Sequence, residues 1–572
     1  MPTKNQLDKA SWQWTETTSP DSVTSEHVQL AYRIRLPACQ RNICRRNCRG
    51  NPNCLVGLGE KDWLCDIKED RWHEIEDPNL ERRDKDSFVG LKNLGATCYV
   101  NTFLQVWFHN HSFRAAMYKW RPLGNQRPKT HGQSEGSLSK ELDNTPLCIC
   151  GHLQLLFALL QFSNRRYIDP SGLVNCLGLD AALQQDAQEF SKLFMSLLEE
   201  TLSQQAHPDV RNVIQQQFCG QYAYVTRCNN CGHSSERPSK FYELDLNIKG
   251  HRELSESLGE FLQDEHLEGA NQYFCDGCRS KQNATRRIQL LQLPPVLNIQ
   301  LLRFIFDRQT GTKKKLNSFI QFPEVLNMTP YLLRKDAETV YELTSVLIHR
   351  GPTAYSGHYV AHVREGGAWH KFNDEEVERI EGRNLKLGSE DDLQDSSPKQ
   401  GKRPKHVKGF HASKNAYMLV YKQRAAAETQ ADDTELLRES LSEESLPGYL
   451  QNLVRRDREQ FEEWVNDMTS MRDGNVASGK ARHEEITRLY LMLPPKPGEA
   501  YEWLRSDWLK QWLNADSNAA CKPIDNTDLV CCHGKLDPDQ IQHVKRASHE
   551  AAAILFFKVW RRTEAVCAQL VS

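Results

Sequence analysis

The sequence of 572 residues contains no apolar run near the length of about 20 residues that a membrane-spanning helix needs. Its N-terminal segment also lacks the apolar stretch of a secretory signal. Neither sign of charge dominates, because 73 Lys and Arg residues face 75 Asp and Glu residues and leave a formal net charge of -2. We therefore expect no membrane association and no direct nucleic-acid binding, and we expect a protein of the cytoplasm and nucleus.

Hydrophobic residues make up 39% of the sequence and charged residues 26%, which is enough for at least one sizeable core. At roughly 100–200 residues per domain, the length predicts three to five folding units. Because thiols stay reduced in the expected compartments, the 18 cysteines should be metal ligands, a nucleophile or buried apolar residues rather than disulfides.

Changes in composition divide the chain into five predicted parts. They are a polar, Cys-containing extension (1–88), a dense domain (89–421), an acidic linker (422–451), a small α/β unit (452–550) and a helical tail (551–572). Polar insertions at 121–146 and 381–410 interrupt the dense domain, and the second contains Lys402–Lys405, which is either a nuclear-import signal or ordinary soluble surface. In the small unit, Leu504, Trp508 and Trp512 recur every four residues and would line one face of a helix.

Cys98 is the candidate nucleophile. It follows Thr97, and apolar residues then recur at helical spacing (Val100, Phe103, Leu104, Trp107 and Phe108). With Thr97 as N-cap, Cys98 lies in the first turn, where free N–H groups and the helix dipole are expected to lower the pKa of a thiol. Asn93, five residues upstream, could donate a hydrogen bond to an oxyanion. A lone Cys at a helix start is more often structural, so this assignment needs a base nearby.

His358 is the candidate base. Residues 358–364 alternate as in a strand, and a hairpin centred on Gly366–Gly367 pairs residues whose numbers sum to about 733. That register brings His358 beside residues 373–375, and an Asn or Asp there would orient the imidazole to accept a thiol proton. His362 and His370 lie on the same predicted hairpin as weaker candidates, while the meeting of His358 with Cys98 is an assumption.

Two C-x-x-C knuckles, Cys228–Cys231 and Cys275–Cys278, are separated by 43 residues. Together they predict a closed tetrahedral site of four thiolates for structural zinc, with no open position for catalysis. The alternatives are two unrelated reduced pairs or a redox motif. A second metal site among the cysteines between Cys39 and Cys65, or at Cys148, Cys150 and His152, is a weaker possibility, and Cys531-Cys532-His533 is expected to be buried filler.

Four segments resemble motifs of the ubiquitin-specific protease family. They are Gly90–Asn101, Gly357–Val360, Gln185–Phe190 and Asn415–Tyr421, and the resemblance spans residues 89–421. It implies an α+β fold class, that of a papain-like cysteine peptidase with fingers–palm–thumb architecture and a zinc ribbon. The implied activity is hydrolysis of the bond after the C-terminal glycine of ubiquitin, with ubiquitin and ubiquitinated proteins as partners.

Family roles transfer to residues of this sequence. The resemblance implies Cys98 as nucleophile, His358 as base, Asn373 or its neighbour Asp374 as orienter, Asn93 as oxyanion donor, and Gly357 and Tyr359 as substrate-binding positions. Asp186 and Glu189 are either contacts for the basic tail of ubiquitin or ordinary helix-surface carboxylates. The family implies a structural zinc and no catalytic cofactor.

Residues 452–550 resemble the DUSP domain found in the same family, which implies interaction with a protein partner of unknown identity. The end of the chain suggests a shortened form. Two further hypotheses are a non-catalytic ubiquitin-binding scaffold and a zinc-dependent nucleic-acid binder, although the net charge supplies no basic surface for the latter.

Overall fold

The computed structural model describes residues 9–39, 50–58, 72–85, 87–122, 148–307, 311–333, 338–353, 356–381, 385, 407–424, 439–514 and 525–562. Two compact units divide the chain. The first comprises residues 79–464, and the second joins residues 1–78 to residues 465–572. Most of the two polar insertions, the Lys402–Lys405 run and three N-terminal cysteines (Cys44, Cys48 and Cys65) lie outside the described residues.

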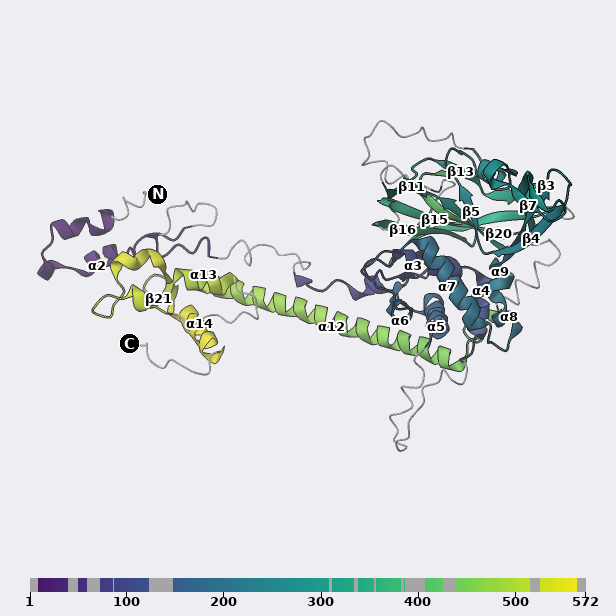
Figure 1. The fold of residues 1–572 in the computed structure, drawn as a ribbon. Helices are drawn as coiled ribbons and strands as arrows, with labels where there is room; N and C mark the ends of the chain where they lie inside the picture. Colours follow the sequence, from purple (N-terminus) through teal and green to yellow (C-terminus); the bar gives the residue numbers. More distant parts are fainter. Residues whose placement is uncertain are drawn as a thin grey trace, which may run out of the picture. The chain divides into compact units, whose positions relative to one another are not determined.

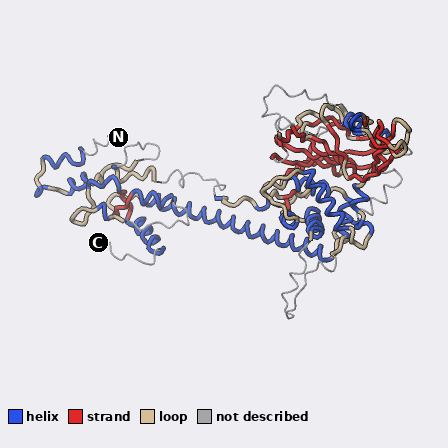
Figure 2. Tube along the Cα trace, viewed as in Figure 1, coloured by secondary structure: helices blue, strands red, loops and turns tan. Residues whose placement is uncertain are grey.

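A layer of helices in the first unit lies on one side of its largest sheet (Figures 1 and 2). They are α3 (Cys98–Phe108), α4 (His111–Lys119), α5 (Ile149–Phe162), α6 (Ser171–Cys176), α7 (Ala187–Leu202), α8 (Pro208–Arg211) and α9 (Val213–Phe218). Every residue of α3 is buried. Its aromatic residues pack on those of α7, with the Trp107 and Phe194 rings stacked 5.1 Å apart between centroids. The predicted helix after Thr97 is therefore confirmed, and it is the central helix of this layer.

An eight-stranded sheet lies against the helices. Its order is β18 (Glu376–Ile380), β17 (Ala368–Asn373), β16 (Ser356–Glu365), β15 (Val340–Thr353), β20 (Ala416–Gln423), β10 (Val296–Leu302) and β5 (Leu244–Asn247), with β14 (Val325–Asn327) also pairing β15. The β16–β17 hairpin has the predicted register, since Ala361 pairs with Phe372 and Glu365 with Ala368. Gly366 and Gly367 both have positive φ, of 58° and 79°, as a tight two-residue hairpin turn requires.

Two smaller sheets carry the cysteine knuckles. One has the order β4 (Ser234–Phe241), β3 (Gly220–Cys228), β9 (Ala284–Gln292) and β6 (Glu265–Leu267), and the other pairs β7 (Tyr273–Cys275) with β8 (Ser280–Gln282). The unit is completed by α10 (Leu254–Phe261) and the pairs β1 (Gly90–Leu91) with β2 (Tyr167–Ile168), β11 (Phe304–Asp307) with β12 (Thr312–Lys315), and β13 (Ile320–Pro323) with β19 (Phe410–Ser413). Cys228 thus ends one strand, and Cys275 ends another.

The segment expected to be a linker, residues 422–451, is partly built into the first unit. Its start belongs to β20, and Leu441, Leu446 and Leu450 join the apolar core around α3 and α5. Helix α12 (Gly448–Met492) continues through residue 452 without a break, and the division between the two units falls within it, after Trp464. The segment is acidic overall, and this composition predicted a linker. Its buried leucines explain why part of it is folded instead.

The second unit combines both ends of the chain. It contains α2 (Ser25–Ala31), β21 (Tyr501–Arg505) paired with β22 (Val544–Ser548), α13 (Ser506–Asn514) and α14 (His549–Arg562). Trp508 and Trp512 line the buried face of α13, whereas Leu504 precedes that helix on β21; all three still share one core.

Part of the N-terminal extension folds against this C-terminal region. Leu55 and Leu58 join its core, Lys545 Nζ donates to the Asn51 carbonyl at 3.0 Å, and Tyr32 Oη donates to the Leu536 carbonyl at 2.6 Å. Because such pairings cross hundreds of residues, composition alone did not indicate them. None of the described helices combines the length and the apolar character needed to cross a membrane.

Candidate active site and cysteine cluster

Cys98 begins α3, with Thr97 in the N-cap position as predicted. The Thr97 side chain, however, makes no capping bond. Its hydroxyl accepts a hydrogen bond from the Leu94 N–H at 3.0 Å and donates to Asn93 Oδ1 at 3.3 Å. Thr97 therefore folds the preceding loop back on itself and places Asn93 beside the start of the helix.

The Cys98 thiol is buried, with 3% of the residue exposed. Burial raises its pKa to about 11, although the backbone N–H of Tyr359, 3.5 Å from Sγ, lowers the pKa. The expectation of a lowered pKa was wrong in direction, because loss of hydration outweighs the hydrogen-bond donors around the sulfur. A thiol with this pKa stays protonated near neutral pH and needs a base to become a nucleophile.

His358 lies next to that donor on β16, so the structure brings the base candidate and Cys98 into one site. Its Nε2 is 2.6 Å from Asn373 Oδ1, at the end of β17. Because a carbonyl oxygen accepts, Nε2 carries the proton and Nδ1 is left to accept one. Asp374 Oδ2 is farther from Nε2, at 3.8 Å, so Asn373 is the direct orienter in this geometry.

The other two histidines of the hairpin lie elsewhere. His362 and His370 are 3% and 8% exposed, and His370 pairs with Val363, as the predicted register requires. Burial lowers the pKa of His370. Neither occupies the end of the hairpin near Cys98, which supports the ranking of His358 above them.

Asn93 and Asp374 contact each other. Asn93 Nδ2 donates to Asp374 Oδ2 at 2.8 Å, which uses one of the two N–H groups on that nitrogen. The same carboxylate accepts from Asn101 Nδ2 at 2.8 Å. Sequence reasoning missed Asn101, although its position three residues after Cys98 on a helix was a usable signal.

Gly357 and Tyr359 flank His358, the base candidate. Gly357 has φ 141°, and a Cβ there would lie 2.2 Å from the Arg350 carbonyl oxygen, so this position has room for no side chain. The Tyr359 side chain is fully buried and packs on His349 and Tyr417. Tyr359 therefore contributes its backbone N–H to Cys98, and its ring lies away from any exposed substrate surface.

Asp186 and Glu189 lie at the start of α7 and differ in availability. Asp186 is the N-cap, accepts from the Gln188 N–H at 2.9 Å, and also accepts from Tyr417 Oη at 2.7 Å. Glu189 is exposed. Asp186 thus has a structural role between α7 and β20, while Glu189 is free to face a ligand.

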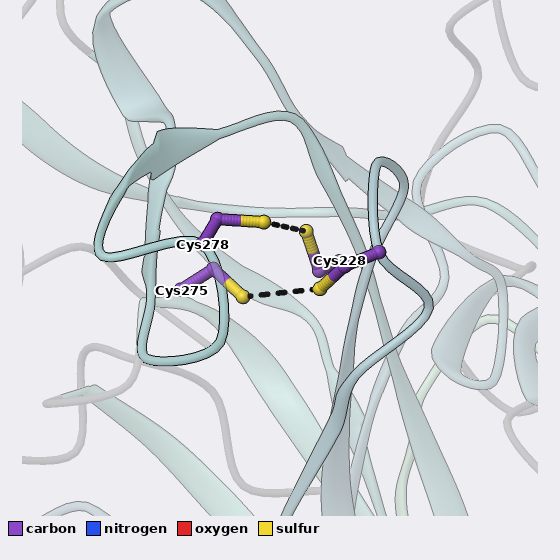
Figure 3. Close-up of side chains that lie close together, drawn as sticks. Cys228, Cys275 and Cys278 are labelled. Carbon is purple, nitrogen blue, oxygen red and sulfur yellow. Dashed lines mark hydrogen bonds between the residues drawn. The ribbon is translucent and has the colours of Figure 1, made fainter.

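Figure 3 shows Cys228, Cys275 and Cys278 with their sulfur atoms directed toward one another. The sulfurs of Cys228 and Cys278 are 3.9 Å apart, and those of Cys231 and Cys275 are 3.5 Å apart. All four sulfurs lie within 4.8 Å of one another. A tetrahedral ion with metal–sulfur bonds of about 2.3 Å requires sulfur separations of about 3.8 Å, so this four-cysteine cluster fits a tetrahedral metal site.

The other cysteines considered as metal ligands are not supported by the geometry of the described residues. Across the described part of the chain, the four-cysteine cluster is the group whose atoms converge for a metal ion. Cys150 is fully buried, and burial raises its pKa to about 12. Cys532 is exposed and Cys531 half-buried, so the expectation of buried filler there was wrong: the pair lies in a surface turn closed by Gly534.

Comparison with known proteins places this geometry in a family. The ubiquitin carboxyl-terminal hydrolase family matches residues 89–421. The chain is 56% identical over 558 residues to ubiquitin carboxyl-terminal hydrolase 48 of Danio rerio, and 55% identical over 558 residues to that of Rattus norvegicus; each alignment covers 97% of this chain. It is also 34% identical over 587 residues to ubiquitin carboxyl-terminal hydrolase 26 of Oryza sativa subsp. japonica, with 94% of the chain covered.

The chain spans about half the length of these relatives, since the alignments cover 51%, 52% and 52% of them respectively. The matched family region contains the nucleophile candidate, the base candidate and the four-cysteine cluster within a mixed α/β unit. The chain therefore belongs to the ubiquitin carboxyl-terminal hydrolase family.

Proposed function

We propose that this chain is a cysteine-type deubiquitinase, which hydrolyses the peptide or isopeptide bond after the C-terminal glycine of ubiquitin. The observation that best supports the proposal is the 3.5 Å contact between the Tyr359 N–H and Cys98 Sγ. This contact supports the proposal because Tyr359 follows His358 directly on β16. The 2.6 Å contact of His358 with Asn373 adds the orientation that a base needs.

In the first step, His358 Nδ1 takes the proton of the Cys98 thiol as Sγ attacks the glycine carbonyl carbon. The carbonyl oxygen becomes an oxyanion, and the free N–H of the Asn93 amide and the backbone N–H groups at the start of α3 are the donors near it. His358 then gives the proton to the departing lysine amine as the C–N bond breaks, leaving a thioester on Cys98.

In the second step, a water molecule loses a proton to His358 and attacks the thioester carbonyl. The C–S bond breaks, ubiquitin leaves with a free carboxylate, and the thiol regains its proton from the imidazole. The high pKa of Cys98 suits this cycle, because the thiolate then forms together with attack and His358 is needed as the base.

The test is intact mass after reaction with ubiquitin bearing a C-terminal thiol-reactive group, together with turnover of a ubiquitin–fluorophore amide. Cys98→Ala should abolish both the adduct and turnover. His358→Ala should lower kcat by about 10²- to 10⁴-fold, the usual contribution of a positioned base. If the folded wild-type protein formed no ubiquitin adduct, the result would instead favour the hypothesis of a non-catalytic ubiquitin-binding scaffold.

Zinc is the metal we propose for the four-cysteine cluster, because four thiolates in tetrahedral positions suit Zn²⁺ and leave no open coordination position. Its role would be structural, holding β3 against the β7–β8 hairpin in a fingers region that contacts the body of ubiquitin. No catalytic cofactor is needed for the steps above.

Glu189, and to a lesser extent the already engaged Asp186, are proposed contacts for the basic tail of ubiquitin. For residues 452–550, most of which belong to the second unit, we propose a DUSP-like role in binding a protein partner. We further propose that the protein acts in the cytoplasm and nucleus.

A further inference from the structure

The turn that follows β17 fits into a socket formed by Gly90, Leu91, Asn93 and Asn101, all from the segment that leads into and begins α3. The Leu91 N–H donates to the Asp374 carbonyl at 2.8 Å, and the Asn93 N–H donates to Glu375 Oε1 at 2.9 Å. This turn directly continues from Asn373, which orients His358. The socket therefore joins the nucleophile segment to the segment that orients the base.

The fit leaves no spare room. A Cβ added at Gly90 would lie 2.5 Å from the Glu375 carbonyl oxygen and 2.7 Å from that of Asp374. Asp374 has φ 51°, a left-handed conformation that residues other than glycine adopt only where their surroundings hold them. Close contact and an unusual backbone conformation in the same turn indicate that its position is fixed by the socket.

Asn101 makes the deepest contact in the socket. It is 2% exposed, and its Nδ2 donates to Asp374 Oδ1 at 2.8 Å and to the Lys92 carbonyl at 3.2 Å. Asn101 lies three residues after Cys98, so the two side chains share one face of α3. One side chain on the nucleophile helix thus holds the carboxylate that also binds the Asn93 amide at 2.8 Å.

We propose that Asn101 is a positioning residue, whose amide holds the Asp374 carboxylate in place. Through that carboxylate it keeps Asn373, His358 and Asn93 at fixed positions relative to Cys98. This inference rests on the proposed function and deepens it by adding a residue that touches neither the substrate nor the reacting atoms. Asn101 acts through Asp374, because that carboxylate is the shared acceptor for the two amides.

The charge of Asp374 depends on the same contact. Burial raises its pKa, the Asn101 amide lowers it, and so do His358 and the Asn93 amide, while Glu375 raises it. The carboxylate in turn raises the pKa of Cys98. Removing the Asn101 amide therefore raises the pKa of Asp374 further. If activity needs the ionised carboxylate, the acidic limb of the activity profile must move to higher pH.

Gln105 provides a matched control for Asn101→Ala. It lies one turn farther along α3, is also 2% exposed, and its Nε2 donates to the Val89 carbonyl at 2.9 Å. Gln105→Ala removes a buried amide from the same helix without touching Asp374. Both variants should lower Tm, but only Asn101→Ala should lower kcat, by about tenfold to a hundredfold, as misplaced catalytic groups do.

The assay is the pH profile of kcat and KM on a ubiquitin–fluorophore amide, with Tm measured for each protein. We expect Asn101→Ala to leave KM within about twofold, because Asn101 is buried and out of reach of a substrate at the surface, and to move the acidic limb of the activity profile to higher pH. The opposing result is an equal loss of kcat in the two variants at equal loss of Tm, with the acidic limb of the pH–activity profile unchanged. That result would show that Asn101 is merely structural and would overturn the proposal.

A reciprocal exchange keeps the test decisive if Asn101→Ala does not fold. Asn101→Asp alone brings two carboxylates into contact, and they repel each other. Combining Asn101→Asp with Asp374→Asn restores a donor–acceptor pair with the two roles exchanged, and the new amide oxygen can still accept from Asn93. The pair should recover Tm lost in Asn101→Asp. A double variant no more stable than the single one would contradict direct coupling.

A ubiquitin-free measurement separates this inference from the proposed function. The pH dependence of Cys98 alkylation by chloroacetamide, followed by peptide mass, senses the site without ubiquitin. If wild-type protein fails to turn over the ubiquitin amide, the proposed function fails. The positioning role then stands only if Asn101→Ala, and not Gln105→Ala, changes the alkylation profile, and it falls if the two variants behave alike.

Discussion

Cys98 and Cys228 are equally hidden from solvent, with 3% and 1% of each residue exposed, yet their surroundings act on the thiols in opposite directions. Burial under the helices and the sheet raises the pKa of Cys98 to about 11. At Cys228, the backbone N–H of Cys231 lowers the pKa to about 7, with help from the N–H of Asn230. Low exposure therefore does not by itself determine the state of a cysteine.

The difference lies in depth and in hydrogen-bond donors. Cys98 starts a helix whose every residue is buried, whereas Cys228 ends a strand beneath a tight turn that directs N–H groups at its sulfur. The hydrogen bond with Cys231 raises the pKa of Cys278, so Cys278 resists ionising beside Cys228 until a dication offsets their charges. Cys98 therefore keeps its proton near neutral pH, whereas Cys228 ionises more readily, as a thiol must when it becomes a metal ligand.

The largest effect should come from removing the proposed zinc. Cys275→Ser, or a strong zinc chelator, should unfold the knuckles, because structural zinc contributes on the order of 10 kcal/mol to small metal-dependent folds. The measurement is bound zinc by elemental analysis together with the thermal unfolding profile. Cys176→Ser, at a half-buried cysteine outside the cluster, is the control. Full zinc content in Cys275→Ser would contradict the assignment of the four-cysteine cluster as the metal site.

A large effect on turnover is also expected from a substitution at Gly357. The backbone of Gly357 packs closely against Arg350, and this packing sets the position of the Tyr359 N–H that donates to Cys98. Gly357→Ala would put a Cβ 2.2 Å from the Arg350 carbonyl oxygen and 2.7 Å from His349 Nε2. We expect loss of turnover by about a hundredfold or more, since the base strand must shift. Gly367→Ala, on the same hairpin with open space around it, should cost only about 1 kcal/mol of stability. Similar turnover in the two variants would refute this account.

The pH dependence of Cys98 provides a sharper comparison with Cys228. In His358→Ala, alkylation of Cys98 should increase about tenfold per pH unit from pH 7 to 10 without levelling, because the thiolate is the reactive form and the pKa lies near 11. With His358 present, the profile should be flatter. A plateau near pH 8 in the variant would mean that the helix start, and not burial, governs this thiol.

The smallest effect concerns the neighbouring charge. The Asp374 carboxylate raises the pKa of Cys98, although less than burial does. Adding Asp374→Asn to His358→Ala should therefore speed Cys98 alkylation at pH 8, by about twofold to fivefold for a partly screened charge. Slower alkylation would show that Asp374 acts on Cys98 through structure and not through charge.

Local patterns predicted the parts of the site that short-range geometry controls. Apolar spacing located α3, alternation and the glycine pair gave the β16–β17 register, and two matched knuckles predicted the four-cysteine cluster. The same reasoning could not assign Leu504 to a strand, because α13 begins two residues later and both elements share one core. Nor could it show that Leu55 packs near the C-terminal region.

The sequence by itself determined which residues are the candidates for the chemistry, because the candidate nucleophile, base, orienter and metal ligands lie in short segments whose spacing follows from helix, hairpin and knuckle geometry. Only the tertiary structure decided how those groups behave. It buried Cys98 deeply enough to reverse the expected direction of its pKa, and committed Asp374 to the amides of Asn93 and Asn101. It also built one unit from both ends of the chain. Desolvation and long-range contacts depend on which distant segments pack together, and the local periodicity of a sequence does not predict which segments those are.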